Sequence, residues 1–596
     1  MAERDGLFST PNRPVESLAV QASSAIARRE QTQFEVLVRH LLHRFFHNEL
    51  LSPDDETKRV MLLSYAAALP GLLVALFLFP AYHAFPPAPL HRPFWSQAGD
   101  HYFYVSYPFV VMGIATVYEW DLLFPDLLDV FVLSNLPIPM RRLFAARVLA
   151  LAIFLSLVLL GTNGLGIVFF PMIAELPGIG RHFLAHAIAA LMSGTFAATT
   201  FLALQGILLN TLGEHLFRRI TPLLQGASLM VLLAVLLVFP MVAQSLQALL
   251  TSNAAAVRSF PPFWFLGIYE RILAGPSAPL IFHTLAHTGC WAVLLMIACT
   301  LLTYPLAYRR RVRQLIEGAS FIHKTSRTAG PIERLLHASI LLLPAQRAIF
   351  HFVSQTILRN QRQRVMLAMY GGLGIAIALS EMLVLRTSSG HLHLSLLPEG
   401  IRSAVPIMAF WTIAGLSSVL ATPIDRRGAW LFQVLLGRAR ADHLAGARLW
   451  ITLWALLVSL GTVLVLHPLS PASLRNIPAT VDQLFIAVSV SFLLADIFFL
   501  NARTLPFTHL RKGSITDLPL RVVRYFVLFP FFVAVLVGLE PWIESNVHHL
   551  LGLVCILGGL HLLLVHEHTR SVQDSAAALP ADDADDFPQS LGLRDS

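Results

Sequence analysis

The side chains with the greatest chemical potential in this sequence are the few polar or ionisable ones inside long hydrophobic stretches. Asp496 lies near the end of one such stretch, and Gln205 holds the corresponding place in an earlier one. A charged group inside a membrane is costly, so residues of this kind are the default candidates for a substrate or ion path. We therefore predict that Gln205 and Asp496 line a path, with helix packing as the alternative role.

Two histidines have the spacing of metal ligands. His283 and His287 are one helical turn apart, and Cys290 follows them. This spacing suits zinc, but the neighbouring sequence supplies no carboxylate or further ligand that completes a set. Hydrogen bonding to a neighbouring helix is therefore favoured. The other acids are scattered, so we expect no metal, no cofactor and no catalytic residue in this chain.

The overall composition defines the setting of these residues. Of the 596 residues, 56% are hydrophobic and 13% are charged, whereas soluble domains carry about 25% charged residues. That supply cannot cover a water-soluble surface of this size, which excludes a soluble enzyme. The three cysteines all lie in apolar runs and exclude a disulfide framework. The predicted fold class is all-α, as a polytopic membrane protein.

Hydrophobic runs of about 20 residues, the length that crosses a bilayer, recur along the whole chain. We predict twelve transmembrane helices in two series of six. We expect no cleaved signal peptide, because the segment before the first run has neither a short hydrophobic region nor a small-residue cleavage site. The predicted spans are 60–80, 101–118, 148–171, 182–210, 223–248, 279–304, 365–385, 401–421, 449–467, 479–500, 525–540 and 546–566.

The distribution of basic residues predicts the orientation. With the N-terminus in the cytoplasm, 36 of the 43 lysines and arginines fall in cytoplasmic segments and 7 in outside segments. An excess of Lys and Arg is typical of the cytoplasmic side, so both termini are expected there. Anionic lipid of the inner leaflet matches this positive charge. The expected partner is therefore the lipid bilayer, with no nucleic acid.

Three short motifs return in the same order on equivalent spans of the two series. Ordered matches of this kind favour a tandem duplication. Because each copy has six spans, the copies share one orientation, and a pseudo-two-fold axis along the membrane normal should relate them. The matched segments are 58–65 with 363–370, 145–162 with 446–462, and 201–210 with 492–501.

The repeat divides the chain into four segments. Residues 1–59 form a cytoplasmic segment whose amphipathic pattern predicts an interfacial helix at about 32–50. A soluble helix packed on the cytoplasmic face is the alternative for that pattern. Residues 60–325 form the first six-span repeat, and 326–570 hold a second interfacial helix and the second repeat. The acidic tail, 571–596, is expected to be disordered.

The loop between the second and third spans is too polar to cross a membrane and too apolar to be free. Residues 120–126 hold the pattern Trp-x-x-x-Phe-Pro-Asp, followed by Leu-Pro-Ile, the pair Arg141-Arg142 and Ala-Arg at 146–147. Pro137 and Pro139 are expected to end a short cytoplasmic helix. This stretch, together with six-span units that each follow an interfacial helix, resembles bacterial ABC-2-type exporter permeases. The aromatic stretch 261–270 resembles uncharacterised membrane proteins encoded beside such permeases.

The resemblance implies an export channel in the bacterial inner membrane, driven by a separate ABC ATPase that docks on cytoplasmic helices. This chain has no Gly-x-x-x-x-Gly-Lys-Ser/Thr phosphate loop, so the partner subunit would bind the ATP. The docking loops that the resemblance implies hold Trp120, Asp126, Asp129, Arg141, Arg142, Asp425, Arg426 and Arg427.

Two other functions remain open. A secondary transporter with two six-span halves would be similar to the major facilitator class, and Asp425-Arg426-Arg427-Gly428 is a partial echo of the inner-loop motif of that class. A non-transporting membrane scaffold or enzyme is the other alternative, for which the sequence offers no site. A neighbouring ATPase gene would favour the exporter, whereas transport that collapses with an ion gradient would favour the secondary transporter.

Overall fold

The computed structural model describes most of the chain between Gln33 and Ala577. The predicted linker around 325 and the second docking loop with Asp425, Arg426 and Arg427 lie outside the described residues, as does Asp126. The described residues are 33–46, 53–83, 92–120, 123–125, 127–133, 138–174, 178–212, 214–252, 254–317, 330–388, 391–422, 441–471, 474–500, 502, 505–507 and 517–577.

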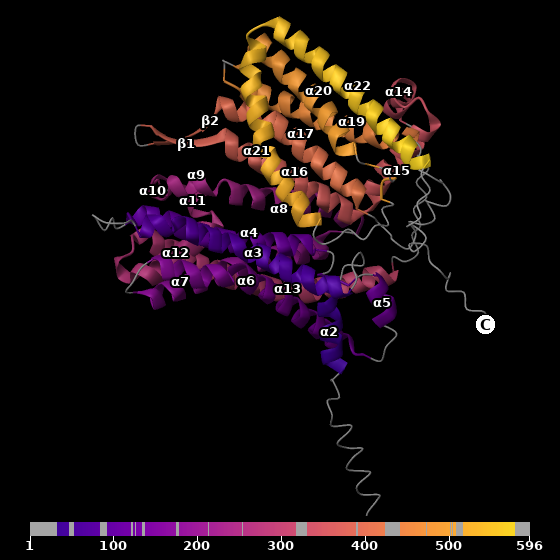
Figure 1. Ribbon diagram of the computed structural model, residues 1–596. Helices are drawn as coiled ribbons and strands as arrows, with labels where there is room; N and C mark the ends of the chain where they lie inside the picture. The colour runs from indigo at the N-terminus through magenta and orange to yellow at the C-terminus, as the bar shows by residue number, and fades with distance from the viewer. Residues whose placement is uncertain are drawn as a thin grey trace, which may run out of the picture.

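The first part of the chain folds into one group of helices, coloured indigo to magenta in Figure 1. Long helices form here because a helix satisfies its own backbone hydrogen bonds, as a lipid environment requires. A short 3₁₀ turn, Gly275–Ser277, precedes the last of them. The helices are α2 (Gln33–Phe46), α3 (Pro53–Tyr82), α4 (Phe94–Tyr118), α5 (Leu127–Leu133), α6 (Met140–Ala174), α7 (Ile179–Thr211), α8 (Glu214–Leu237), α9 (Phe239–Gln244), α10 (Leu246–Thr251), α11 (Ala255–Arg258), α12 (Pro261–Ala274) and α13 (Leu280–Glu317).

The second part of the chain forms the other group, coloured orange to yellow in Figure 1. It includes one β-hairpin and a 3₁₀ turn at His467–Leu469. Its elements are α14 (Pro331–Ser339), α15 (Pro344–Arg359), α16 (Gln361–Met382), β1 (Leu383–Ser388), β2 (His391–Leu396), α17 (Pro398–Ala421), α19 (Ala441–Leu466), α20 (Ile477–Phe499), α21 (Asp517–Glu544) and α22 (Val547–Ala577).

Ten of the described helices are long and apolar enough to cross a bilayer, which confirms a multi-pass, helical membrane protein. Two of the twelve predicted spans are not among these ten. In α3, the side chains that the structure describes give a shorter apolar segment, Ala66–Tyr82. Helix α4 carries polar residues such as Asp100 and His101 and is buried along most of its length. A helix enclosed by other helices needs no uniformly apolar surface, so its hydropathy is lower.

Two helices depart from the predicted span boundaries. The span expected at 223–248 is interrupted after Leu237, and α9 follows with Pro240 in its first turn. Proline has no N–H and cannot continue the hydrogen bonds of α8. Helix α13 has 38 residues, about 57 Å at 1.5 Å per residue, and extends past a hydrocarbon core of about 30 Å. The basic run 309–313 is therefore helical rather than part of a linker.

Helix α16 leads directly into an antiparallel hairpin, which is the exception to an otherwise helical fold among the described residues. Strands β1 and β2 pair Leu383 with Leu396 and Ser388 with His391. The sequence from His391 to Leu396 alternates polar and apolar residues, a pattern typical of strands. The span predicted at 365–385 therefore ends as a helix at Met382. Helix α22 continues to Ala577 and so includes the first residues of the segment 571–596.

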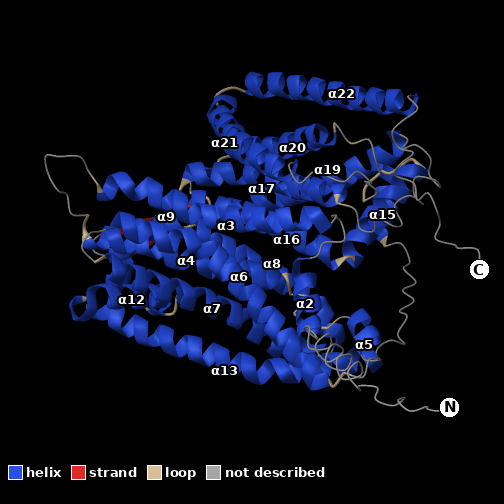
Figure 2. Cartoon of the chain, turned by 60° about the horizontal axis from the view of Figure 1, so that its bottom comes forward, coloured by secondary structure: helices blue, strands red, loops and turns tan. Residues whose placement is uncertain are grey.

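Each group is built around one enclosed helix, and one helix pair joins the groups. The enclosed helices are α4 in the first group and α17 in the second. Helices α8 and α16 lie along the boundary, which Figures 1 and 2 show from two directions. Small residues bring them close, since a Cβ on Gly372 would lie 3.1 Å from Met230 Cα. Close backbone approach through glycine is a common mode of helix packing in membranes.

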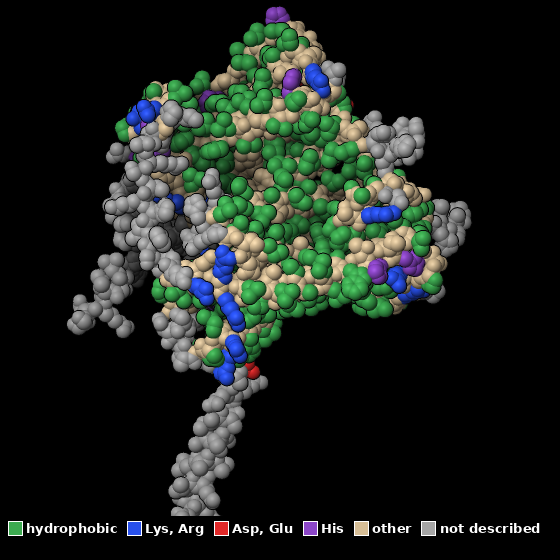
Figure 3. Space-filling view, turned by 180° about the vertical axis from the view of Figure 1, so that it is seen from behind, with side chains coloured by type: hydrophobic (Ala, Val, Ile, Leu, Met, Phe, Trp, Pro, Cys, Tyr) green, Lys and Arg blue, Asp and Glu red, His purple; other side chains and the backbone are tan. Residues whose placement is uncertain are grey.

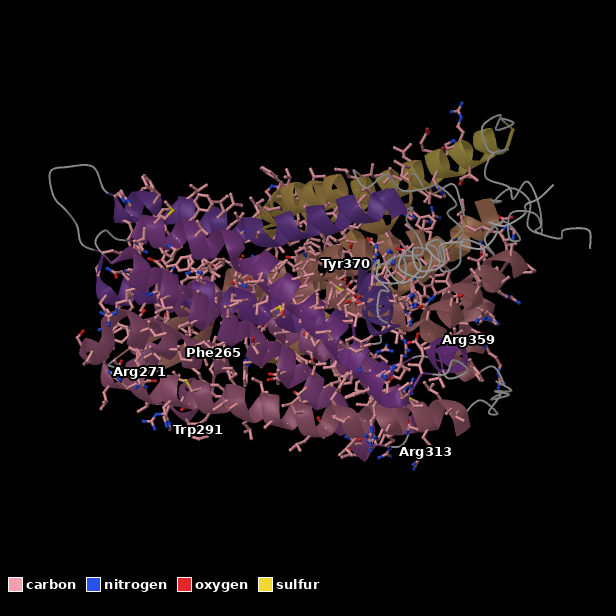
Figure 4. The ribbon with its side chains drawn as sticks, turned by 90° about the horizontal axis from the view of Figure 1, so that it is seen from below. Phe265, Arg271, Trp291, Arg313, Arg359 and Tyr370 are labelled. Carbon is pink, nitrogen blue, oxygen red and sulfur yellow. The ribbon has the colours of Figure 1, made fainter. Side chains whose placement is uncertain are left out.

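The surface fits a lipid environment. Hydrophobic side chains cover most of the rear face, Lys and Arg gather toward its margins, and the face is hollowed between the two groups (Figure 3). Arg271 lies at one end of the bundle, whereas Arg313 and Arg359 lie at the opposite end (Figure 4). We name these the α12 end and the α2 end, because α12 and α2 lie there (Figure 2).

Candidate functional site

A carboxylate and an imidazole meet inside the first group of helices. His101 is on α4, Glu270 is on α12, and His101 Nδ1 lies 2.6 Å from Glu270 Oε1. Their side chains are 1% and 2% exposed, respectively. Helix α12 packs on α4 through Phe263 and Leu266, which share a hydrophobic cluster with Tyr102. The aromatic sequence of α12 thus positions Glu270 against the enclosed helix.

Two further histidines, one turn apart on α7, face this pair. The ring centroid of His182 lies 6.2 Å from that of His101, and the His186 ring lies 5.8 Å from Tyr269. Tyr269 stacks on His101 with 4.2 Å between ring centroids. All five side chains lie within three neighbouring helices. We call His101, His182, His186, Tyr269 and Glu270 the histidine cluster.

Many polar atoms of the histidine cluster have no hydrogen-bond partner. These atoms are Nε2 of His101, Nδ1 of His182, both ring nitrogens of His186 and the hydroxyl of Tyr269. An unsatisfied buried polar atom costs about 1–3 kcal/mol, and native structures contain few of them. Their concentration on neighbouring side chains inside a membrane protein favours a functional role over simple packing.

A fully matched ion pair borders the histidine cluster. Arg92 donates from Nη2 to Asp100 Oδ1 at 2.8 Å, and the Tyr82 hydroxyl donates to Asp100 Oδ2 at 2.9 Å. Hydrogen bonding to Asp100 raises the pKa of Arg92 above its ordinary value. The charge of Asp100 is therefore neutralised one residue before His101, which leaves Glu270 as the carboxylate that acts on the imidazole.

A second buried polar cluster lies in the other group of helices. Arg402 Nη2 of α17 lies 3.0 Å from Glu544 Oε1 of α21. Asp482 and Gln483 of α20 and Glu540 of α21 are also buried, and each acid interacts electrostatically with Arg402. We call Arg402, Asp482, Gln483, Glu540 and Glu544 the arginine cluster. The guanidinium of Arg402 stays protonated at any physiological pH, unlike a histidine.

The structure does not bring a metal-binding set together among the residues that it describes. No group of three or more His, Cys, Asp or Glu side chains there could hold a metal ion. On α13, His287 Nε2 accepts a hydrogen bond from Trp291 Nε1 at 3.0 Å, and Cys290 is exposed. His287 therefore bonds along its own helix, and a hydrogen bond to a neighbouring helix stays a prediction.

Asp496 is buried and paired. Its Oδ2 contacts His561 Nδ1 of α22, and its Oδ1 lies 3.7 Å from Arg448 Nη1 of α19. These contacts join α20 to two neighbouring helices, which agrees with the helix-packing alternative. The path-lining role of Asp496 stays a prediction.

Gln205 and Trp120 contact each other within the first group. The Gln205 side chain donates from Nε2 to the Trp120 carbonyl oxygen at 2.8 Å. Trp120 is 1% exposed and packs with Val117 and Leu229. Gln205 therefore holds the end of α4 against α7, and Trp120 has no surface to offer to an ATPase in this conformation.

Asp129 of α5 bridges arginines from two other helices. Its Oδ1 accepts from Arg44 of α2, and its Oδ2 accepts from Arg147 Nη1 of α6 at 2.9 Å. Arg147 Nη2 also donates to the Phe124 carbonyl oxygen at 2.7 Å. Asp129 is buried, so its carboxylate holds helices together and does not face a partner. Arg141 and Arg142, by contrast, are exposed at the start of α6.

Sequence reasoning missed the histidine cluster. In the sequence, Glu270 is one of the scattered acids that form no motif, whereas the structure places it on the buried helix α12. His182 and His186, one turn apart near the start of a predicted span, were an available signal. The pairing of His101 with Glu270 gave no signal in the sequence, because the two residues are 169 positions apart.

The helices, the apolar surface and the buried ion pairs define the class of this protein as a multi-pass, α-helical membrane protein. Comparisons with family models, curated proteins and solved structures gave no match for the chain. The resemblance to ABC-2-type exporter permeases therefore stays a prediction that rests on the motifs at 120–147 and 261–270.

Proposed function

We propose that this chain is the membrane-spanning permease subunit of an exporter that a separate ABC ATPase drives. The observation that carries the proposal is the Asp129 bridge. It ties α2 and α5, which lie outside the candidate spans, to the spanning helix α6. Contiguous contacts of this kind would let a motor outside the membrane move a spanning helix.

The exposed side of α5 suits a protein partner. Phe131 and Val132 are 53% and 56% exposed, and Arg141 and Arg142 are exposed nearby in the sequence. Aromatic residues and arginine are enriched at protein interfaces. On its other side, α5 packs on the last part of α13 through Val130. A force on α5 would therefore reach both α6 and α13.

Correspondences between the two groups support the proposed six-span repeat. Helix α2 packs on α6 around Ala146. Helix α15 packs on α19 so closely that a Cβ on Gly446 would lie 2.7 Å from the Gln346 carbonyl oxygen. In each case the arginine that follows this contact in the sequence pairs with a buried aspartate. Arg147 pairs with Asp129, and Arg448 pairs with Asp496. We infer two repeats of six spans, at 60–325 and 326–570.

The proposed orientation puts the α2 end in the cytoplasm of a bacterium. Arg313 and Arg359 lie at that end (Figure 4), within a segment that holds many of the basic residues of the chain. Cytoplasmic segments carry this excess in inner-membrane proteins. Both termini would then be cytoplasmic, and α5 would face the compartment that holds ATP.

Affinity purification tests the exporter. The tagged full-length chain, extracted from the cells that make it, should bring an ABC ATPase with it. Val132→Asp and the double change Arg141→Glu/Arg142→Glu should reduce the recovered ATPase by about tenfold or more, because either change disrupts the docking surface. Arg271→Glu, at the opposite end of the bundle, is the matched control and should leave recovery unchanged. Wild-type protein that never retains an ATPase would overturn the proposal.

A proton-coupled secondary transporter is the second candidate, and the histidine cluster favours it. Chains of Asp, Glu and His inside spans form the proton relays of such transporters. Two six-span halves that rock about a central site are also typical of that class. The two functions differ in what drives them. Resistance of cells to exported toxic compounds should depend on the ATPase gene in the first case, and on the proton gradient alone in the second.

A further inference from the structure

We propose that the first group of helices holds a proton-binding site, in which Nε2 of His101 takes up the proton. The ligand is H⁺ from water at the α12 end of the bundle. The inference does not rest on what drives the protein, because helices of this chain supply every group that it uses. It also assigns a role to the histidine cluster, which the docking of an ATPase leaves unexplained.

Glu270 determines which nitrogen of His101 is free to accept a proton. Glu270 Oε1 lies 2.6 Å from His101 Nδ1, and in the proposed tautomer the ionised carboxylate accepts from Nδ1–H. A neutral imidazole has one donor and one acceptor nitrogen, so Nε2 carries the lone pair. This Nε2 is buried and has no hydrogen-bond partner. A proton bound there would form an imidazolium in direct contact with a carboxylate, and the opposite charge favours that protonated form.

The rings around His101 also favour its protonated form. Tyr269 lies face to face with the imidazole, with 4.2 Å between centroids and 21° between planes. A cation over an aromatic face is attracted by the negative charge of that face. Phe170 of α6 approaches edge-on, with 5.7 Å between centroids. His101 is therefore enclosed by groups that tolerate a positive ring better than a purely aliphatic site would.

His182 is a neighbouring side chain that would have to turn to accept from the new N–H of His101, because no hydrogen bond joins the two rings in this structure. Its ring is a neighbour of His101, and its Nδ1 has no partner. One proton on Nε2 would turn an unsatisfied acceptor into a donor and could satisfy two unpartnered atoms together. His186, further along α7, contacts Tyr104 and Tyr269 and would remain neutral, because a second buried positive charge would repel the first.

Other charged groups around the histidine cluster have partners of their own or are exposed, so Glu270 is the carboxylate that pairs with His101. Asp100 on α4 is held by Arg92 and by Tyr82 of α3. On α7, Arg181 donates to the Ile272 carbonyl oxygen at 2.7 Å. On α12, Arg271 is exposed. Helix α13, which packs on α12, carries His283 and His287.

The arginine cluster provides an internal comparison. Arg402 pairs with Glu544 at 3.0 Å in the second group, as His101 pairs with Glu270 in the first. An arginine keeps its charge at all physiological pH values, whereas a histidine changes charge between about pH 5 and 8. Arg402 therefore offers no nitrogen that can take up a further proton, unlike Nε2 of His101.

Nitrogen-15 NMR of histidine-labelled full-length protein in lipid nanodiscs tests the site between about pH 8 and pH 5. His101→Gln identifies the signal of His101 by its loss. In wild-type protein, that ring should carry one proton, on Nδ1, at the higher pH and two at the lower pH. Glu270→Gln should move the midpoint down by about one pH unit or more, because the carboxylate that favours the cation is removed.

His287→Gln is the matched control, because it removes an exposed histidine of the same group of helices and should leave the His101 titration unchanged. A His101 ring that stays neutral at the lower pH would overturn the proposal, as would an unchanged midpoint in Glu270→Gln. Should His101→Gln fail to give monodisperse protein, His101→Asn provides the assignment. Every group that this experiment reads belongs to this chain, so its outcome is independent of the copurification result.

Discussion

At the scale of residues, a buried charge is stable in a membrane protein only when a group on a neighbouring helix matches it. Asp129 matches Arg147 from α6 and Arg44 from α2, and Asp496 matches His561 and Arg448. Each of these carboxylates connects separate helices. The buried charges therefore specify which helices meet, in addition to any role in transport.

Removing the charge of Asp129 should destabilise the protein. In Asp129→Asn, the buried guanidinium of Arg147 loses its carboxylate, and an uncompensated buried charge costs about 3–5 kcal/mol. The midpoint of thermal unfolding in detergent should fall clearly. Arg142→Gln, an exposed change on α6, the helix of Arg147, should alter stability by no more than about 0.5 kcal/mol. Equal midpoints for the two variants would contradict a structural role for the bridge.

At the scale of elements, α12 is the helix that positions Glu270, and its placement depends on Gly267. A Cβ on Gly267 would lie 2.7 Å from Ala286 N and 2.9 Å from the Phe282 carbonyl oxygen of α13. These are backbone atoms, which cannot move aside as a flexible side chain does. Glycine at this position therefore lets α12 lie directly on α13 and reach across to α4.

A larger residue at Gly267 should force α12 and α13 apart. We expect Gly267→Val to lower the free energy of unfolding by about 1–3 kcal/mol, the usual effect of overpacking. Gly164→Ala on α6 is the control, because a Cβ there meets no atom within 4 Å. That change should be neutral or stabilising by about 0.5–1 kcal/mol, since alanine favours a helix. Chemical denaturation of both variants measures the difference, and equal losses would refute the packing argument.

At the scale of the whole molecule, two groups of helices meet along α8 and α16, and glycine makes that contact possible. Gly372 faces Met230, and Gly226 lies opposite Ala368, where a Cβ on Gly226 would be 3.0 Å from the Ala368 Cβ. Close packing substitutes for a hydrophobic driving force between helices in lipid. The two groups should therefore recognise each other without the segment that joins them.

A chain divided within residues 318–329 tests this contact. The two co-expressed parts should copurify, and Gly372→Leu should abolish copurification because the side chain would overlap α8. Gly371→Leu is a closely matched control, since a Cβ on Gly371 meets no atom within 4 Å. Parts that copurify equally well with both substitutions would show that other contacts hold the groups together.

Local properties of the sequence were enough to predict the class of protein, most spans and the helices outside them. Hydrophobic length and helical periodicity are properties of adjacent residues, so 148–171 and 182–210 matched α6 and α7. The amphipathic helix at 32–50 also formed as α2. Its apolar face packs on α6 through Leu37 and Leu41, in agreement with the packed alternative.

The sequence by itself determined that this chain is a multi-pass membrane protein, because scarce charge and long apolar runs leave no other surface for it. Only the tertiary structure decided which polar groups meet. His101 and Glu270, which are 169 positions apart, face each other because α12 packs on α4. The tertiary structure likewise buries Asp129, because Arg44 of α2 and Arg147 of α6 pair with its carboxylate. Pairing between distant helices depends on packing geometry, which no local pattern encodes.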